Sequence, residues 1–329
     1  MYWYVKLILF LIVLTILLLI GRCSYNRLIA PRLDREPEPS EVTEDEEDVE
    51  LEDHALPGAE IDPGIEELSS EGRRLLERAE SQLDGGNLIA ARSQARRVLR
   101  DHQPRKFSDP WRKAAEIISK VNTKLINSDI PAPEKERYQV RSGDSLARIA
   151  RRFGTTVEAI QRMNNIEPEQ SHIYPGMTLF IHSGDWSILV SKENFALVLY
   201  DGEELFKVYD VGIGRQDRTP AGTFVIHNKL REPVWTPPGR RIPYGDPENV
   251  LGTRWLGLLP TGETNTALTG YGIHGTWEPE TIGTAASQGC VRMKNEDVNE
   301  LYDLIPHPPS NRERLRENPR KGVEVIIEE

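Results

Sequence analysis

The sequence predicts a multidomain α+β protein with a membrane helix at its start. An apolar run long enough to cross a bilayer opens the chain. Apolar residues then recur at helical spacing over residues 65–127, and the segment from Trp186 onward is rich in β-forming residues. Helices and strands that follow each other in blocks are typical of separate domains.

The N-terminal segment, Met1–Ile20, contains Lys6 as its only charged residue. It lacks the polar face of an amphipathic helix, which disfavours a place in a soluble core. A cleaved signal peptide needs small residues after its apolar core, whereas Arg22 lies there. The same arginine disfavours lipid attachment at Cys23. We therefore favour an uncleaved transmembrane anchor at residues 1–21, and cleavage is the alternative.

The charges that flank this segment leave its orientation open. Lys6 precedes the apolar run, and four arginines follow it: Arg22, Arg27, Arg32 and Arg35. A count by the positive-inside rule places the rest of the chain in the cytoplasm. The chemistry of the later segments favours the opposite side.

The net charge of the chain is concentrated in one stretch. The formal net charge is −11, and residues 34–53 hold twelve acidic residues against one arginine. Because the remainder is close to neutral, nucleic acid is not an expected partner. Residues 22–63 are predicted to form a disordered acidic linker, since the acidic stretch also carries Pro37 and Pro39 and no aromatic residue. A specific cation or partner site there is the alternative.

Residues 64–128 are predicted to form a small helical region. Its apolar stripes are Leu75, Leu76, Ala79 and Leu83, then Leu88, Ala91, Ala95, Val98 and Leu99, then Trp111, Ala115, Ile118 and Leu125. The stretch AESQLDGGNLIAARSQARRVL resembles one tetratricopeptide hairpin, although such repeats need about three copies for stability. We expect a spacer or docking module, and the alternative is a peptide-binding groove for a protein partner. Residues 129–137 follow as a linker.

Residues 138–182 carry the signals of a strand–helix–helix–strand unit. A short strand is followed by two helices, and each helix begins at polar capping residues. Asp144 or Ser145 can cap the first helix, and Thr155 or Thr156 the second.

This unit resembles a LysM module, both in its opening YQVRSGDSLARIARRFG and in its closing NNI and IYPGMTLFI. LysM modules bind glycans that contain N-acetylglucosamine, including peptidoglycan. The resemblance places the glycan groove between the first strand–helix turn and the turn before the last strand. The residues it implicates are Gly143, Asp144, Ser145, Ile173, Tyr174 and Pro175.

Residues 184–329 are predicted to form a mainly-β domain with few helices. The stretch LVLYDGEELFKVYDVGIG has the composition of a hairpin with a turn at residues 201–204. Asn295 can cap a helix, and residues 323–327 form the last strand.

Cys290 is the one cysteine of this domain, and the chain has only Cys23 besides. Two cysteines cannot build a disulfide framework, so we expect both thiols to be unpaired. His274 lies 16 residues before Cys290, and an imidazole beside a thiol can take its proton and return it to a leaving amine. The amides of Gly289 and Cys290 can face a developing oxyanion, and Arg292 can hold a carboxylate. A buried cysteine and a hydrogen-bonded histidine without catalytic roles are the alternative.

The string YGIHGTWEPETIGTAASQGCVRM closely resembles the catalytic motif of the L,D-transpeptidase (YkuD) family. The family pattern is His-Gly, a spacer, and then Ser/Thr-X-Gly-Cys with Arg or Asn two positions on. His274–Gly275, Ser287–Cys290 and Arg292 match it here. The stretches VGIGRQDRTPAGTFVI and NVLGTRWLGL also match, so the resemblance covers about residues 186–327.

The resemblance implies a role for each matching residue. Cys290 is the nucleophile, and His274 is the base, oriented by a backbone carbonyl near Gly275. Ser287 and the amides of Gly289 and Cys290 shape the oxyanion site. Arg292, Gln288 and Tyr271 contact the substrate. Many members carry a histidine where this chain has Gln288, which leaves the balance of transfer over hydrolysis open.

The reaction implied is peptidoglycan cross-linking without a metal or organic cofactor. Cys290 attacks the amide after the third residue of a stem tetrapeptide, D-alanine leaves, and the amine of a second stem resolves the thioester into a 3→3 cross-link. Both modules act on cell-wall material, so we expect a single-pass inner-membrane protein with its catalytic domain in the periplasm or cell wall. The alternatives are a related acyl transfer, either protein anchoring to the wall or L,D-carboxypeptidase activity, and a non-catalytic LysM tether.

Overall fold

The computed structural model describes residues 68–170, 172–309, 311, 315 and 322–329. The membrane helix expected at residues 1–21 and the acidic linker expected at residues 22–63 lie outside this part of the chain. Every helix within the described residues is too short or too polar to cross a bilayer.

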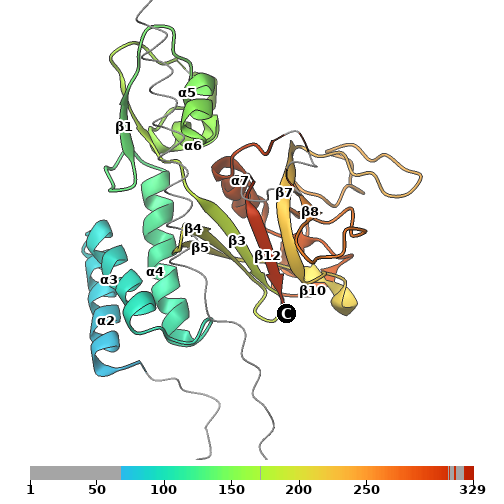
Figure 1. Cartoon of the computed structure of the whole chain (residues 1–329), viewed down its shortest axis with the longest axis horizontal. Helices are drawn as coiled ribbons and strands as arrows, with labels where there is room; N and C mark the ends of the chain where they lie inside the picture. The colour runs from blue at the N-terminus through green and yellow to red at the C-terminus, as the bar shows by residue number, and fades with distance from the viewer. Residues whose placement is uncertain (1–67, 171, 310, 312–314, 316–321) are drawn as a thin grey trace, which may run out of the picture. The chain divides into compact units, whose positions relative to one another are not determined.

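Three helices come first in the described part of the chain, as the apolar stripes predict (Figure 1). They are α2 (Ser70–Asp84), α3 (Leu88–Asp101) and α4 (Asp109–Ile126). Ser69 caps α2, because its hydroxyl accepts a hydrogen bond from the Gly72 amide at 3.1 Å. Gly86, at a φ of 75°, makes the turn into α3. The predicted stripes of all three helices meet in one apolar cluster.

The βααβ unit predicted at residues 138–182 is confirmed, except that its first strand begins at Glu136, within the stretch 129–137 that was expected to be linker. Its elements are β1 (Glu136–Gln139), α5 (Leu146–Phe153), α6 (Val157–Met163) and β2 (Thr178–Ile181). The two strands pair antiparallel, with Tyr138 opposite Leu179. The hydroxyls of Ser145 and Thr156 cap α5 and α6. Residues of all four elements form a small apolar core of their own.

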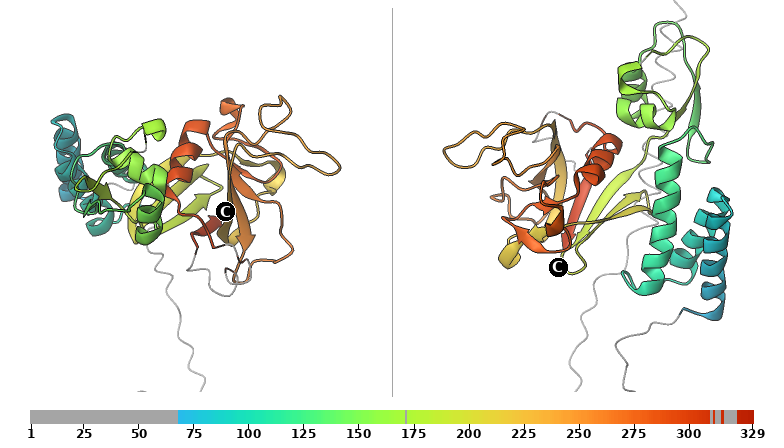
Figure 2. Two further views of the ribbon diagram at one scale, coloured as in Figure 1. Left: turned by 90° about the horizontal axis from the view of Figure 1, so that it is seen from above. Right: turned by 180° about the vertical axis from the view of Figure 1, so that it is seen from behind.

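The last part of the chain is built on a mixed sheet of eight described strands in the order β11-β9-β8-β7-β12-β3-β4-β5 (Figures 1 and 2). The strands are β3 (Trp186–Ser191), β4 (Ala196–Asp201), β5 (Glu204–Asp210), β7 (Gly222–Arg231), β8 (Arg254–Pro260), β9 (Gly272–His274), β11 (Val291–Arg292) and β12 (Glu324–Glu328). The predicted hairpin is the β4–β5 pair. The last strand, β12, lies between β3 and β7, parallel to β3 and antiparallel to β7.

Shorter elements complete this domain. β6 (Ile213–Gly214) and β10 (Ala285–Ser287) pair in parallel beside the main sheet. The helix α7 (Asn295–Leu304) follows β11 directly. Short 3-10 turns lie at Pro168–Gln170, Arg215–Asp217 and Pro279–Thr281. A mainly-β domain with few helices was predicted, and this part of the chain has that composition.

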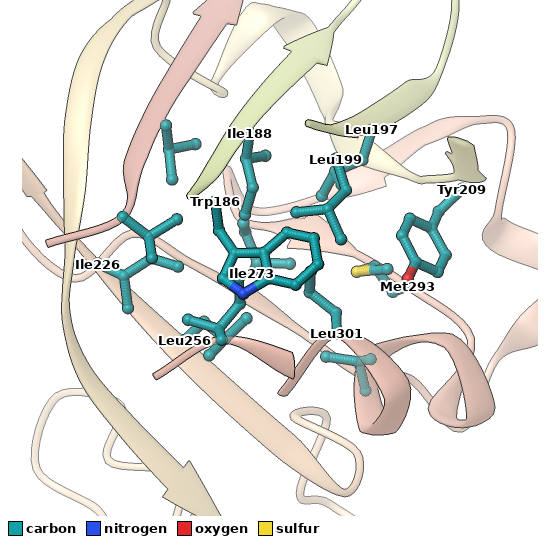
Figure 3. Packing of buried hydrophobic residues seen from close by; sticks show 14 of the residues in the cluster. Trp186, Ile188, Leu197, Leu199, Tyr209, Ile226, Leu256, Ile273, Met293 and Leu301 are labelled. Atoms are coloured by element: carbon teal, nitrogen blue, oxygen red, sulfur yellow. The ribbon is translucent and has the colours of Figure 1, made fainter. Parts of the chain in front are cut away.

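The main apolar core lies between the sheet and α7 (Figure 3). Trp186 and Leu199 point into it from β3 and β4, and Ile273 reaches it from β9. Leu301 of α7 closes the opposite side. Because Ile273 is buried here, the residue beside it on the strand, His274, projects to the other face of the sheet.

The helical region packs on the edge of this sheet. β5 is an edge strand, and two of its backbone groups are bonded by α4 instead of by another strand. Asn122 donates to the Phe206 carbonyl at 2.7 Å, and the Val208 amide donates to the Ser119 hydroxyl at 3.1 Å. The region expected to be a spacer therefore completes the sheet by covering groups that would otherwise need another partner.

The βααβ unit also contacts the sheet domain, through α6. Ala159 and Met163 of α6 belong to the main core. Arg162 donates to the Asp303 carboxylate of α7 at 2.6 Å, and the Thr156 hydroxyl donates to the Asp303 carbonyl.

Candidate active site

His274 is the last residue of β9 and is almost fully buried. Its Nδ1 lies 2.6 Å from the Gly275 carbonyl oxygen. A carbonyl only accepts hydrogen bonds, so in the neutral imidazole Nδ1 carries the proton and Nε2 is free to accept one. Trp255, opposite His274 on β8, stacks on the imidazole with 5.8 Å between ring centroids. The ring plane and the tautomer are thus both fixed.

Burial lowers the pKa of His274 to about 4, and the Arg292 guanidinium lowers it further against the opposing effects of the Gly275 and Leu251 carbonyls. The imidazole is therefore neutral near pH 7 and is able to act as a base. Burial raises the pKa of an acid, because it disfavours the charged form. It raises the pKa of the Cys290 thiol to about 11, although the Gly272 amide and Arg292 act in the lowering direction. At rest the site holds a thiol and a neutral imidazole.

Pairing between β9 and β11 brings the two groups to one face of the sheet. The strands are parallel, with Val291 opposite Ile273 and Arg292 opposite His274. Side chains alternate between the two faces of a sheet, so Cys290, two residues before Arg292, lies on the same face as His274. The thiol contacts the Gly270 carbonyl at 3.7 Å, and within the described residues no hydrogen bond joins it to the imidazole. The two side chains thus lie on the same face of neighbouring strands without a hydrogen bond between them.

The Ser287 hydroxyl organises the turn that carries Cys290. It donates to the Cys290 carbonyl at 2.6 Å and accepts from the Gly289 amide at 3.0 Å. The Gly289 amide, which was expected to face an oxyanion, is thus bonded to Ser287 in this structure. Across the described residues no acceptor is bonded to the Cys290 amide. That amide is the backbone donor left at the turn.

Gly289 is held too closely for any side chain. Its φ is 137°, and a Cβ there would lie 2.9 Å from both the Arg218 carbonyl oxygen and the Tyr271 ring. Tyr271, predicted to contact substrate, therefore packs against the turn. On the other side, a Cβ on Gly214 would lie 2.8 Å from the Gly289 Cα. The turn that carries Cys290 therefore packs directly against β6.

The sequence did not single out Thr219, which joins this turn to β6. Thr219 is only 1% exposed, accepts from the Gly214 amide at 2.7 Å and donates to the Gly289 carbonyl at 2.9 Å. Its signal lay in the stretch VGIGRQDRTPAGTFVI, which matches the family pattern.

Arg292, predicted to hold a substrate carboxylate, is paired within the chain. Its guanidinium donates to Glu278 at 2.8 Å and to the Thr281 hydroxyl at 3.3 Å. Glu278 is largely exposed, so a competing carboxylate can reach the pair from solvent. Gln288, also predicted to contact substrate, is exposed beside Cys290.

Gly275 is buried against Asn295, the first residue of α7. Asn295 accepts from the Thr253 amide at 3.1 Å and donates to the Thr276 carbonyl at 2.9 Å. A Cβ on Gly275 would lie about 2 Å from the Asn295 Oδ1 atom. The prediction that Asn295 caps α7 is wrong, since Lys294 occupies the cap position and the Asn295 side chain braces the strand of His274 instead.

The residues predicted to bind glycan lie on two adjoining turns. The Val140 amide donates to the Met177 carbonyl, and the Gly176 amide donates to the Val140 carbonyl, each at 2.8 Å. Asp144 accepts from the Tyr138 hydroxyl at 2.7 Å and Ser145 caps α5, so both also stabilise the fold.

Exposure separates the remaining residues of this set. Tyr174 is 65% exposed and Gly143 and Pro175 are exposed, whereas Ile173 packs partly on the small core. The accessible part of the predicted groove is therefore the pair of turns around Gly143 and Tyr174.

The described residues hold no cluster of three or more histidine, cysteine, aspartate or glutamate side chains arranged to bind a metal ion. What the site offers is a thiol, a neutral base of fixed tautomer and one backbone donor. This set can carry out acyl transfer through sulfur.

Comparison with known proteins gives the same assignment. A family model of the L,D-transpeptidase catalytic domain matches residues 185–327, and a LysM domain model matches residues 138–182. A Bacillus licheniformis relative that bears the name L,D-transpeptidase YkuD is 36% identical over 180 residues, which cover 52% of this chain and 93% of the relative. The chain belongs to the YkuD L,D-transpeptidase family.

Two Bacillus subtilis relatives carry similar names. The L,D-transpeptidase YkuD is 33% identical over 176 residues, covering 52% of this chain and 93% of the relative. The L,D-transpeptidase YqjB is 34% identical over 146 residues, covering 44% of this chain and 79% of the relative. The chain is thus an L,D-transpeptidase with a LysM domain, as its motifs predict, and both matches leave about half of it without a counterpart.

Proposed function

We propose that this L,D-transpeptidase forms 3→3 cross-links in peptidoglycan through a thioester on Cys290. The pairing of β9 with β11 carries the proposal, because it sets His274 and Cys290 on one face with the imidazole Nε2 unprotonated. The donor is a stem tetrapeptide, and the acceptor is the side-chain amine at the third position of a second stem.

The resting protonation state restricts how the thiol is activated. Since the pKa of the thiol lies well above that of the imidazole, a resting thiolate–imidazolium pair is not populated. Proton transfer from sulfur to His274 therefore accompanies attack on the carbonyl carbon. The tetrahedral oxyanion that forms is stabilised by the Cys290 amide.

Breakdown of this intermediate regenerates the base. The bond from carbon to the D-alanine nitrogen breaks, and the proton on His274 passes to that nitrogen, which leaves a thioester. The second amine then attacks the thioester and loses its proton to His274. Collapse releases the new amide and returns the proton to sulfur.

Arg292 supplies a binding role at the same site. We infer that a stem carboxylate displaces Glu278 from the guanidinium, since that glutamate is largely exposed and already shows the geometry of a carboxylate partner. The two LysM turns hold the glycan strand of the same polymer.

The sequence supports an anchored location. We propose that residues 1–21 span the inner membrane with the catalytic domain on the periplasmic side, where the substrate lies. A reporter fused after Glu329 that is active only in the cytoplasm would overturn this orientation.

The deciding experiment is intact-protein mass spectrometry of the chain from residue 65 onward, mixed with disaccharide-tetrapeptide. A thioester adduct and 3→3 dimers are expected, and neither is expected with Cys290→Ala. An adduct with D-alanine release but no dimers would favour hydrolysis or a protein acceptor. Glycan binding without any adduct would favour a non-catalytic tether.

A further inference from the structure

Both peptide units that flank Cys290 are fixed by hydroxyl groups from other parts of the turn region. The unit after Cys290 is held by Ser287, which donates to the Cys290 carbonyl. The unit before it is held by Thr219, which donates to the Gly289 carbonyl at 2.9 Å. The motif around Cys290 includes Ser287, whereas Thr219 comes from the segment between β6 and β7.

The bond from Thr219 has a consequence for the other side of the same peptide unit. In a trans peptide the carbonyl and the following N–H point in opposite directions within one plane. Fixing the Gly289 carbonyl on Thr219 therefore also fixes the direction of the Cys290 N–H. Because the Gly289 N–H is bonded to Ser287, this is the backbone donor left for an oxyanion.

Thr219 itself has little freedom. Its hydroxyl accepts from the Gly214 amide at 2.7 Å, so its single proton is directed to the Gly289 carbonyl. The residue is 1% exposed, and a Cβ on Gly214 would lie 2.8 Å from both the Gly289 Cα and the Thr219 nitrogen. The Thr219 side chain makes both hydrogen bonds directly, and rotation to another rotamer would break both.

We propose that Thr219 is a positioning residue that aims the Cys290 amide at the oxyanion of the acyl-transfer intermediates. This role rests on the acyl transfer proposed for Cys290 but not on the identity of the peptidoglycan substrate. Thr219 touches neither the sulfur nor the substrate, and it acts through the Gly289–Cys290 peptide unit.

Two reactions of the same thiol separate this role from general support of the fold. Acylation by p-nitrophenyl acetate passes through an oxyanion, whereas alkylation by iodoacetamide does not. In Thr219→Val, which keeps the shape but loses both hydrogen bonds, the acylation rate is expected to fall about 10- to 100-fold, because loss of one oxyanion donor typically costs 10²- to 10³-fold. Alkylation is expected to stay within about twofold of wild type.

Thr219→Ser keeps the hydroxyl and is expected to restore most of the acylation rate. The matched control is Thr261→Val, a threonine 3% exposed whose hydroxyl bonds the Thr223 carbonyl away from the turn, and it should leave both rates unchanged. If the valine variant does not fold, the ratio of acylation to alkylation in Thr219→Ala gives the same readout.

Three results would overturn the proposal. These are an acylation loss no greater than in Thr261→Val, a parallel loss of alkylation and acylation, or a wild-type acylation rate equal to that of Cys290→Ala. Fast acylation without any cross-linked product would instead contradict only the proposed function.

Discussion

Burial of the Cys290 thiol raises its pKa to about 11, and this value predicts how the residue reacts with pH. The rate of alkylation by iodoacetamide should rise about tenfold per pH unit through pH 9 and level off only near pH 11, because the thiolate is the reacting form. The unfolded chain, which is the internal control, should level off near the ordinary cysteine pKa of about 8.5. A plateau below pH 7 would show that a thiolate–imidazolium pair exists at rest.

At this scale the sequence identifies candidates for the reacting groups but not their supports. Cys290 and His274 are proposed from their match to the L,D-transpeptidase motif, because a cysteine and a histidine at this spacing alone are equally compatible with residues that have no catalytic role. Thr219 and Glu278 have ordinary sequence contexts, and their roles depend on contacts made after the strands have paired. Which of the two neighbouring amides is free to bind an oxyanion also depends on such a contact, because the Ser287 hydroxyl occupies the Gly289 amide.

At the scale of the elements, the backbone of the edge strand β5 is hydrogen-bonded by side chains of α4. The alternation of apolar residues predicts the β4–β5 hairpin, but it does not show which strand ends the sheet. Asn122 and Ser119 are ordinary polar residues in a helical pattern, and only the fold places them opposite the backbone of β5. A spacer was therefore the natural interpretation of the sequence, although these helices cover the sheet edge.

Asn122→Leu should destabilise the protein through this edge. Asn122 is fully buried and also accepts from Arg92 at 2.6 Å, so the substitution removes the side-chain donor of the Phe206 carbonyl and one acceptor of Arg92, which keeps its pairing with Glu134. The expected loss in free energy of unfolding is about 1–3 kcal/mol, measured by urea denaturation. Lys120→Ala, an exposed change on the same helix, is the control and should cost less than about 0.5 kcal/mol. Equal losses in the two variants would show that α4 is not needed at the edge.

At the scale of the whole molecule, contacts between the modules contribute to stability. The LysM unit places Ala159 and Met163 in the main core, and its Arg162 reaches Asp303 on α7. The sequence identifies each module by its own pattern, but such surfaces carry no local signal, because a residue buried between two modules resembles one buried within either.

Arg162→Ala should therefore lower the stability of the catalytic domain as well as that of the LysM unit. Asp303 is almost buried and would lose its guanidinium partner, at a cost of about 1–3 kcal/mol. Differential scanning calorimetry should show one transition that moves as a whole. Arg151→Ala, an exposed change on α5, is the control. Two separate transitions, with only the smaller one shifted, would mean that the modules unfold independently.

His182 makes the stability of the junction between the LysM unit and the sheet domain depend on pH. It follows β2, and its Nε2 lies 2.9 Å from the Asp201 carboxylate while its Nδ1 lies 3.1 Å from the Glu134 carbonyl. Burial disfavours the charged imidazole, but Asp201 and the Glu134 carbonyl outweigh burial, so the pKa of His182 lies above its ordinary value of 6.5.

Because the folded pKa is raised, this contribution to stability is complete below about pH 6.5 and is lost as the pH rises through the folded pKa. His182→Asn should therefore lower the melting temperature more at pH 6 than at pH 9. His172→Asn, an exposed change in the same unit, is the control. A difference that grows with pH would contradict the sign.

The high pKa of the Cys290 thiol has a consequence for the life of the enzyme between reactions. The thiolate, not the thiol, is the form that attacks peroxides and disulfides, so a sulfur that stays protonated is oxidised slowly. In the proposed mechanism the proton leaves the sulfur only as the bond to the substrate carbon forms, so no free thiolate is left for an oxidant to meet. An oxidising compartment would then spare the thiol both in the idle enzyme and during turnover.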